Sequence, residues 1–218
     1  MKKFELTNDF IIFCGIKLFR IRALIEFGDV KAGEVGGYVE KEENLSKIDN
    51  AWIYDNAKVF GDAKVFGDAK VFDDAKVFGN AWIYDNAEVF GNAKVFGNAW
   101  IYDNAEVFGD AKVFGDAKVF GDAKVFGDAW IFGGANVSGE AELSGNADYT
   151  TISGFGREYR TTTFFREKDR IAVKCGCFYG GLDEFRKKVK ETHKDSKKGK
   201  EYLMIADLIE YHFEKEEK

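Results

Sequence analysis

The side chains best suited to bind a charged molecule lie late in the chain, in the segment YRTTTFFREKDR at residues 159–170. Guanidinium groups form paired hydrogen bonds with phosphate and carboxylate oxygens, and threonine hydroxyls add neutral donors. The segment therefore predicts a site for a small anionic ligand, although an exposed strand with charged side chains explains the same pattern. The residues assigned to this site are Arg160, Thr161, Thr162, Thr163, Arg166, Arg170, Lys174 and His193.

Two cysteines beside this segment raise the question of metal binding. Cys175 and Cys177 flank one glycine, and His193 follows on the next predicted helix. Structural zinc sites take four ligands, so C-x-C with a single histidine is too few. We therefore predict no metal and no cofactor. A reactive thiol beside Lys174 or Arg170 is a further interpretation that the sequence leaves open.

A six-residue repeat in the middle of the chain must position these groups. AKVFGD occurs three times without change over residues 111–128, and variants fill residues 51–146 as 16 hexapeptides. Within each unit, Ala and Val (or Ile) alternate with Lys (or Trp, Glu) and Phe (or Tyr), as in a strand with one buried face. The last two positions hold Gly, Asp or Asn, which accept a left-handed corner.

A short strand and a corner that always bury the same side predict a solenoid, because hairpins would reverse the buried side. Three units close a triangular coil of about 18 residues, and successive coils stack about 4.8 Å apart as parallel strands. Val, Ile and Ala then line the interior, where each buried Val contributes about 1.5–3 kcal/mol. The predicted fold class is mainly β: a parallel β-helix of about five to six coils.

Aromatic residues recur at every sixth position and point outward in this solenoid, which gives each of the three faces an aromatic ladder. Stacking on the copies above and below explains the ladders by itself. Apolar surface of this extent also predicts a cover: a symmetry-related copy, the N-terminal segment or the C-terminal segment. The predicted oligomer surface comprises Phe60, Phe78, Phe96, Phe114, Trp82, Trp100, Tyr84 and Tyr102.

The flanking segments predict an N-terminal β cap (residues 1–43), the hexapeptide solenoid (44–154) and a small C-terminal α+β domain (155–218). The cap contains a hairpin that turns at Gly15, with Cys14 as a small buried residue. In the C-terminal domain, two strands precede two amphipathic helices, a ββαα order. The second helix is expected to bury Tyr202, Leu203, Ile205, Ala206, Leu208, Ile209 and Phe213.

Charge and hydropathy argue against two classes of partner. Residues 51–146 hold 8 Lys against 15 Asp and Glu, so their field opposes a nucleic-acid polymer. No run of 18 apolar residues is present, and we predict no membrane span. The first residues do not resemble a signal peptide, and three cysteines without disulfide spacing favour reduced thiols and a cytoplasmic location.

The repeat resembles the hexapeptide-repeat superfamily, whose fold is a left-handed parallel β-helix. Three stretches look closest to members from phages and prophages and to YdcK-like proteins: RIRALIEFGDVKAGEVGGYVE (20–40), YVEKEENLSKIDNAWIYDNA (38–57) and TTTFFREKDRIAVKCGCFYGGLDEFRKKVKETH (161–193). Because such β-helices often form parallel trimers, the resemblance implies a homotrimer in the cytoplasm of a bacterial host cell.

The superfamily's acyltransferases commonly use a histidine near a coil as general base. This chain has only His193 and His212, and both follow the repeat. We therefore predict no catalytic residues and a non-enzymatic, oligomeric ligand-binding protein. The resemblance implies a phage role such as sequestering a host defence nucleotide. An acyltransferase-like enzyme and a structural or virion assembly protein are the alternatives.

Overall fold

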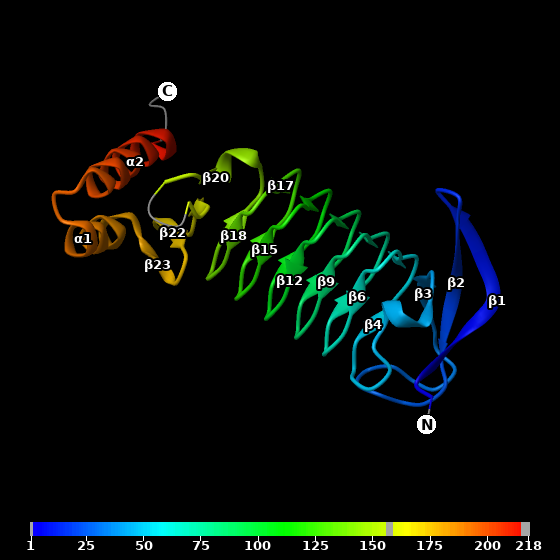
Figure 1. Ribbon diagram of the computed structural model, residues 1–218. Coiled ribbons are helices and arrows are strands. Elements are labelled where there is room, and N and C mark those ends of the chain that lie inside the picture. The colour runs from blue at the N-terminus through cyan, green and yellow to red at the C-terminus, as the bar shows by residue number, and fades with distance from the viewer. Residues whose placement is uncertain (1, 156–158, 215–218) are drawn as a thin grey trace.

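A computed structural model of the chain describes residues 2–155 and 159–214 (Figure 1). An N-terminal hairpin, a parallel β-solenoid of about six turns, and a C-terminal antiparallel sheet with two helices follow one another along the molecule. The predicted fold class, a mainly β solenoid with a C-terminal α+β part, is confirmed.

Each hexapeptide contributes one two-residue strand, and strands 18 residues apart pair in parallel, as Lys64, Trp82, Trp100 and Lys118 do. Three sheets result, which are called faces A, C and D below. Face A has the strand order β3-β5-β8-β11-β14-β17, where β3 is Val35–Val39; face C has the order β6-β9-β12-β15-β18, and face D the order β4-β7-β10-β13-β16-β19. The strands are β4 (Trp52–Ile53), β5 (Lys58–Val59), β6 (Lys64–Val65), β7 (Lys70–Val71), β8 (Lys76–Val77), β9 (Trp82–Ile83), β10 (Glu88–Val89), β11 (Lys94–Val95), β12 (Trp100–Ile101), β13 (Glu106–Val107), β14 (Lys112–Val113), β15 (Lys118–Val119), β16 (Lys124–Val125), β17 (Trp130–Ile131), β18 (Asn136–Val137) and β19 (Glu142–Leu143).

The interior is built from the two apolar positions that the pattern assigned to it. Every repeat alanine from Ala51 to Ala141 is at most 1% exposed, and so is the second residue of each two-residue strand from Ile53 to Leu143. The residue between them points outward, and so does the aromatic residue that follows. The expectation that Val and Ala line the coil and the rings lie on its surface is confirmed.

The corners depend on backbone that few residues adopt. The fifth position of each unit from Asp55 to Gly139 has a positive φ, for example +72° at Gly97 and +57° at Asp103. Where aspartate replaces glycine there, its carboxylate accepts an amide hydrogen bond from the next coil, as Asp103 Oδ2 does from Gly121 N at 3.1 Å. This bond compensates for the left-handed backbone that a side chain disfavours.

The backbone hydrogen bonds between coils have one polarity, and each end of the solenoid is closed accordingly. The N–H groups of one coil donate to the carbonyls of the next, as Lys94 N does to Ala111 O at 2.9 Å. The first coil therefore leaves carbonyl groups free, and Lys3 Nζ donates to one of them, Ala51 O, at 2.7 Å. The last coil leaves amides free, and Thr163 Oγ1 accepts from Asn136 N at 2.9 Å.

The N-terminal hairpin extends face A. β1 (Phe4–Phe13) pairs with β2 (Ile16–Ala23), and β2 pairs with β3 (Val35–Val39), which runs parallel to β5; a short 3-10 turn, η1 (Glu42–Asn44), follows. Cys14 is exposed at φ +50°, so the expectation that it is buried is wrong, because it occupies the two-residue turn with Gly15. The predicted domain boundary between the cap and the solenoid, at residues 43 and 44, stays a prediction, because strands from both sides of it, β3 and β5, pair in one sheet.

The C-terminal part starts as a direct continuation of the last coil. After η2 (Asn146–Asp148), an antiparallel sheet forms in the order β20 (Tyr149–Ile152), β21 (Thr162–Arg166), β22 (Ile171–Cys175), β23 (Phe178–Gly181), and α1 (Leu182–His193) and α2 (Lys197–Phe213) follow. β20 and β23 add to the two strands singled out in the sequence. Among the described helices, neither has the length and apolar character needed to cross a membrane.

This antiparallel sheet is a layer between the solenoid and the helices. Phe165 and Ala172 belong to the hydrophobic core of the solenoid, whereas their sequence neighbours Phe164 and Val173 pack with the helices. The alternation follows from the strand period of two. The sheet therefore closes the C-terminal end of the hydrophobic column, and the helices cover its outer face (Figure 1).

Candidate binding surfaces

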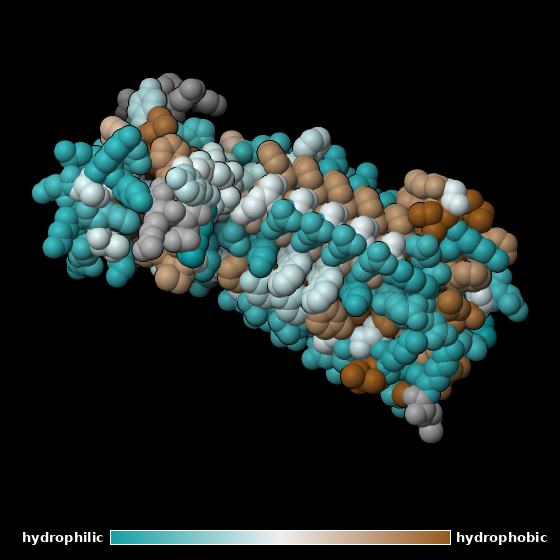
Figure 2. Space-filling view, in the orientation of Figure 1, coloured by the Kyte–Doolittle hydropathy of each residue, from teal (hydrophilic) through white to brown (hydrophobic). Residues whose placement is uncertain are grey.

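The rings on the outside of the coils form continuous stacks. Neighbouring rings have centroids 4.7–5.4 Å apart and planes within 15° of parallel. Figure 2 shows these residues as brown and pale rows along the solenoid, beside teal rows of charged side chains. Because each ring face is occupied by the next ring, mainly the ring edges point outward. Nucleobases and sugar rings bind aromatic side chains through free ring faces, and this surface offers few of them.

On face A, the chain covers the start of its own ladder. Phe60 is only 9% exposed, lies edge-on to Phe13 of the hairpin at a centroid distance of 5.8 Å, and packs with Leu18 and Tyr38. Of the covers considered for the ladders, the N-terminal segment therefore accounts for the first rung of this face. Phe60 is consequently not accessible to a second copy, whereas Phe96 and Phe114 are partly exposed further along.

Face C carries an aromatic block at its centre. Trp82 and Trp100 stack at 5.4 Å beside Tyr84 and Tyr102 at 5.0 Å, and all four side chains are partly exposed. Burial, together with neighbouring phenol and carboxylate groups, raises the pKa of Tyr102 to about 12. The block is framed by two ammonium groups: Lys64 Nζ lies 5.7 Å from the Trp82 ring and Lys118 Nζ lies 4.2 Å from the Trp100 ring.

The three threonines proposed as ligand contacts bond to the protein itself. Thr161 Oγ1 lies 2.8 Å from Ser153 Oγ, and Thr162 Oγ1 donates to Cys175 Sγ at 3.1 Å. Thr163, fully buried, accepts the amide of the last coil described above. The side chains of Thr162 and Thr163 therefore face the interior.

The two arginines on β21 and in the following turn are also engaged. Arg166 donates from Nη2 to Phe213 O at 3.0 Å, which fixes the end of α2 against the sheet. Arg170 donates from Nε to Glu167 Oε2 at 2.7 Å, and the Tyr179 hydroxyl bonds to the same carboxylate. The hollow beside them, between the last coils and the β21–β22 turn, has mainly acidic charge. Its lining is Asp122, Gly139, Glu140, Glu167, Lys168, Asp169, Arg170 and Tyr179.

The remaining proposed ligand residues point to different surroundings. Lys174 Nζ lies 5.6 Å from the Phe120 ring at the end of face C, and His193 packs on the Tyr202 ring at 5.6 Å. Arg160 is exposed. The eight residues therefore do not converge on one pocket, and the anion site proposed from them stays a prediction. Over the described parts of the chain, His, Cys, Asp and Glu side chains form no group of three arranged to hold a metal ion.

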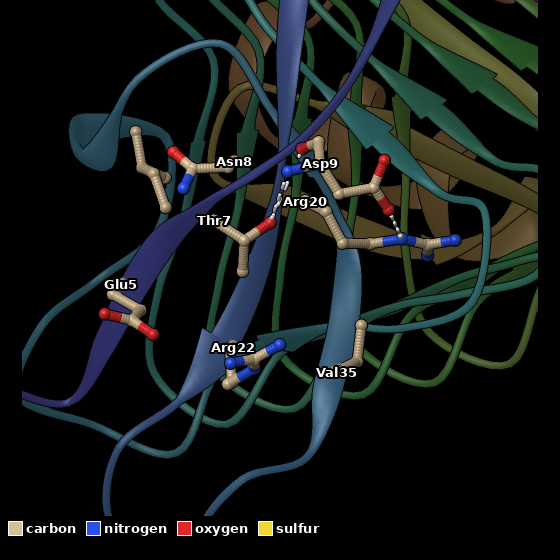
Figure 3. Close-up of a pocket in the computed structure, with 8 residues that line it drawn as sticks. Glu5, Thr7, Asn8, Asp9, Arg20, Arg22 and Val35 are labelled. Atoms are coloured by element: carbon tan, nitrogen blue, oxygen red, sulfur yellow. Dashed lines mark hydrogen bonds and ion pairs between the residues drawn. The ribbon is translucent and has the colours of Figure 1, made fainter.

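A hollow of about 570 Å³ at the N-terminal hairpin is a second candidate surface (Figure 3). It forms where the β1–β2 register shifts between Leu6 and Phe10, and Thr7 Oγ1 accepts from Asp9 N at 3.2 Å within that bulge. Sequence analysis missed it, although the polar Thr7-Asn8-Asp9 interrupts an otherwise apolar alternation. Its lining is Glu5, Leu6, Thr7, Asn8, Asp9, Arg20, Arg22 and Val35.

The two arginines of this hollow differ in their roles. Arg20 Nη1 donates to Gly36 O of β3 at 3.0 Å and to Asp55 O at the first corner of the solenoid, and its guanidinium lies 4.2 Å from the Tyr38 ring, so it ties the hairpin to the first coil. Arg22 is exposed and has no ion-pair partner among residues 2–155 and 159–214. The guanidinium of Arg22, with Thr7 and Asn8 nearby, offers donors for a small anion, although the carboxylates of Glu5, its cross-strand neighbour, and Asp9 also line the hollow.

Comparison with protein-family models and with curated proteins found no match for this chain. The structure itself is consistent with the hexapeptide-repeat β-helix that the sequence resembles.

Proposed function

We propose that this protein is a non-enzymatic binding protein that acts as a homotrimer, with the aromatic block of face C as its subunit contact. The observation that carries the proposal is the stack of Trp82 on Trp100 beside Tyr84 on Tyr102, a rigid apolar surface left open at the middle of the coils. Apolar patches of this kind commonly mark contact sites.

A second copy fits this surface better than other partners do. Every copy has the same spacing between rungs, so the ring edges of one ladder match the grooves of another along several coils. A nucleic-acid polymer is disfavoured, because ring faces are occupied and the coils hold more acidic than basic residues. The Lys side chains that frame the block leave its centre uncharged, as in the core of most protein interfaces.

The test uses substitutions that the coil already accepts at equivalent positions. Lysine stands in the Trp82 column at Lys64 and Lys118, so Trp82→Lys with Trp100→Lys preserves the solenoid. The matched control on face D is Glu88→Lys with Glu106→Lys, because Lys70 and Lys124 occupy that column. We expect light scattering to give the control three times the mass of the tryptophan variant, whether or not a further contact joins the trimers. The same mass for both variants, or a wild-type mass of only one or two chains, refutes the proposed contact.

A small anionic ligand is the second candidate function, favoured by the unpaired Arg22 in the N-terminal hollow. The resemblance to phage and prophage proteins implies a nucleotide of the bacterial cytoplasm. We expect nucleotides to raise the melting temperature of the wild-type chain and of Arg160→Gln, but not of Arg22→Gln. A shift lost in Arg160→Gln instead places the ligand at the C-terminal cluster, and no shift with nucleotides or inorganic phosphate refutes this function.

A further inference from the structure

The helix α2 is apolar on two opposite faces. On the inner face, Ile205, Ala206, Ile209 and Phe213 are buried against the sheet and α1. On the outer face, three large apolar side chains recur at a spacing of four and three residues, so they form one stripe along the helix. The stripe consists of Met204 (65% exposed), Leu208 (60%) and Tyr211 (75%).

This stripe corrects the sequence analysis, in which Leu208 was expected to be buried. A helix needs only one apolar face to pack against the core of its own domain, and α1 packs in this way through Leu182, Phe185 and Val189. The second face of α2 contributes nothing to that core. Large apolar side chains in a row on the surface indicate a contact with another molecule.

The charges along α2 run against the helix dipole. Its first turn carries Lys197, Lys198 and Lys200 and no acidic residue, although Glu201 follows and lies 3.8 Å from Lys197; the end of the helix carries Glu210 and Glu214. Cations are favoured at the C-terminus of a helix and anions at its N-terminus, so this order is unfavourable for the helix by itself. Lys200 and Glu214 lie beside opposite ends of the stripe, and neither forms an ion pair within the described residues.

We propose that two copies of this chain pair through the outer stripe, with their α2 helices antiparallel about a two-fold axis. In this arrangement Leu208 lies against Leu208 of the partner subunit, and Met204 lies near Tyr211 of the partner subunit. Lys200 then lies beside Glu214 of the partner subunit, and the pair occurs twice because a two-fold contact repeats every interaction. The antiparallel helix dipoles add to the attraction.

Charge complementarity identifies the occupant as a second copy. One stripe offers both the cation and the anion, eight residues before and six residues after Leu208, so long side chains can bring them together after a two-fold rotation. In coiled coils, a seam of apolar residues is likewise flanked by charged residues that pair between the helices and set their orientation. The contact lies on the C-terminal helices, away from face C, and it does not depend on the trimer proposed above.

Charge reversal tests the pairing in the full chain. We expect Leu208→Glu to halve the mass measured by light scattering, whatever assembly the coils form, with little change in melting temperature. Lys200→Glu and Glu214→Lys each place like charges together twice and weaken association at least about tenfold. The double variant Lys200→Glu/Glu214→Lys restores association. Lys188→Glu on α1 makes the same charge change away from the stripe and is expected to leave the mass unchanged.

Two results overturn the proposal. An unchanged mass in Leu208→Glu shows that the stripe does not join two copies and points to a different partner protein. A double charge variant that associates no better than the single variants excludes the antiparallel register, even if the stripe itself is a contact.

Discussion

Asn98 Nδ2 donates to Asp116 Oδ1 one coil above at 2.9 Å, and Asn98 Oδ1 accepts from Asn80 Nδ2 one coil below at 3.0 Å. The same order recurs from Asn86 through Asn104 to Asp122. Each amide ladder therefore runs towards the C-terminal end and stops at a carboxylate, which accepts a hydrogen bond and has no proton to pass on.

This order predicts an asymmetric response to charge. Asn98→Asp sets a carboxylate against Asp116 and removes the donor between them, so we expect a loss of about 1–2 kcal/mol at pH 7. Urea unfolding measures the loss, which should shrink at about pH 3.5, where carboxylates take up protons. The control Asp116→Asn keeps an acceptor facing Asn98 and should change stability little. Equal stability of Asn98→Asp and wild type at pH 7 contradicts the ladder's role.

The corner aspartates predict that glycine is a better substitute than alanine. Asp103→Ala keeps a side chain at φ +57° and leaves Gly121 N without its acceptor, so we expect a loss of about 2 kcal/mol in the free energy of unfolding. Asp103→Gly loses the same bond but relieves the backbone, and about 1 kcal/mol of the loss returns. Chemical denaturation of both variants checks the order, and a more stable alanine variant would falsify the explanation.

The fully buried Thr163 closes the last coil through its hydroxyl. Thr163→Val preserves the volume but leaves the amide of Asn136 without an acceptor, which costs about 1–3 kcal/mol. Thr163→Ser retains the oxygen and should lose less. Thermal melting compares the two, and hydrogen exchange at Asn136 should accelerate only in the valine variant. Similar melting temperatures for both variants would instead indicate that water or another group satisfies the amide.

Lys3 predicts a stability that increases in mildly alkaline solution. Its side chain is almost fully buried, and burial lowers its pKa from 10.5 to about 8. Between these values the unfolded chain holds more protons than the folded chain, so stability rises with pH, by up to about 3 kcal/mol. We expect urea midpoints to increase from pH 7.5 to 9.5 in wild type and to stay flat in Lys3→Met. A wild-type midpoint that falls over this range is the contrary outcome.

The parts of the fold that follow from the repeat could be predicted residue by residue. Each coil contacts only the coils above and below, so one hexapeptide pattern decides the interior, the corners and the outward rings. Val95 and Ala99 are buried, Gly97 turns the corner and Phe96 stacks on its neighbours because the same environment recurs every 18 residues.

The ends of the solenoid and the candidate sites depend on contacts that no spacing in the sequence encodes. Whether Phe60 is covered depends on where the hairpin packs, and whether Thr163 faces a ligand or the last coil depends on how the antiparallel sheet meets the solenoid. Leu208 has the helical spacing of a core residue, yet α2 has two apolar faces and the core accepts one. The sequence by itself determined the solenoid, because its order is local and repeated, whereas only the tertiary structure decided which surfaces remain free to bind.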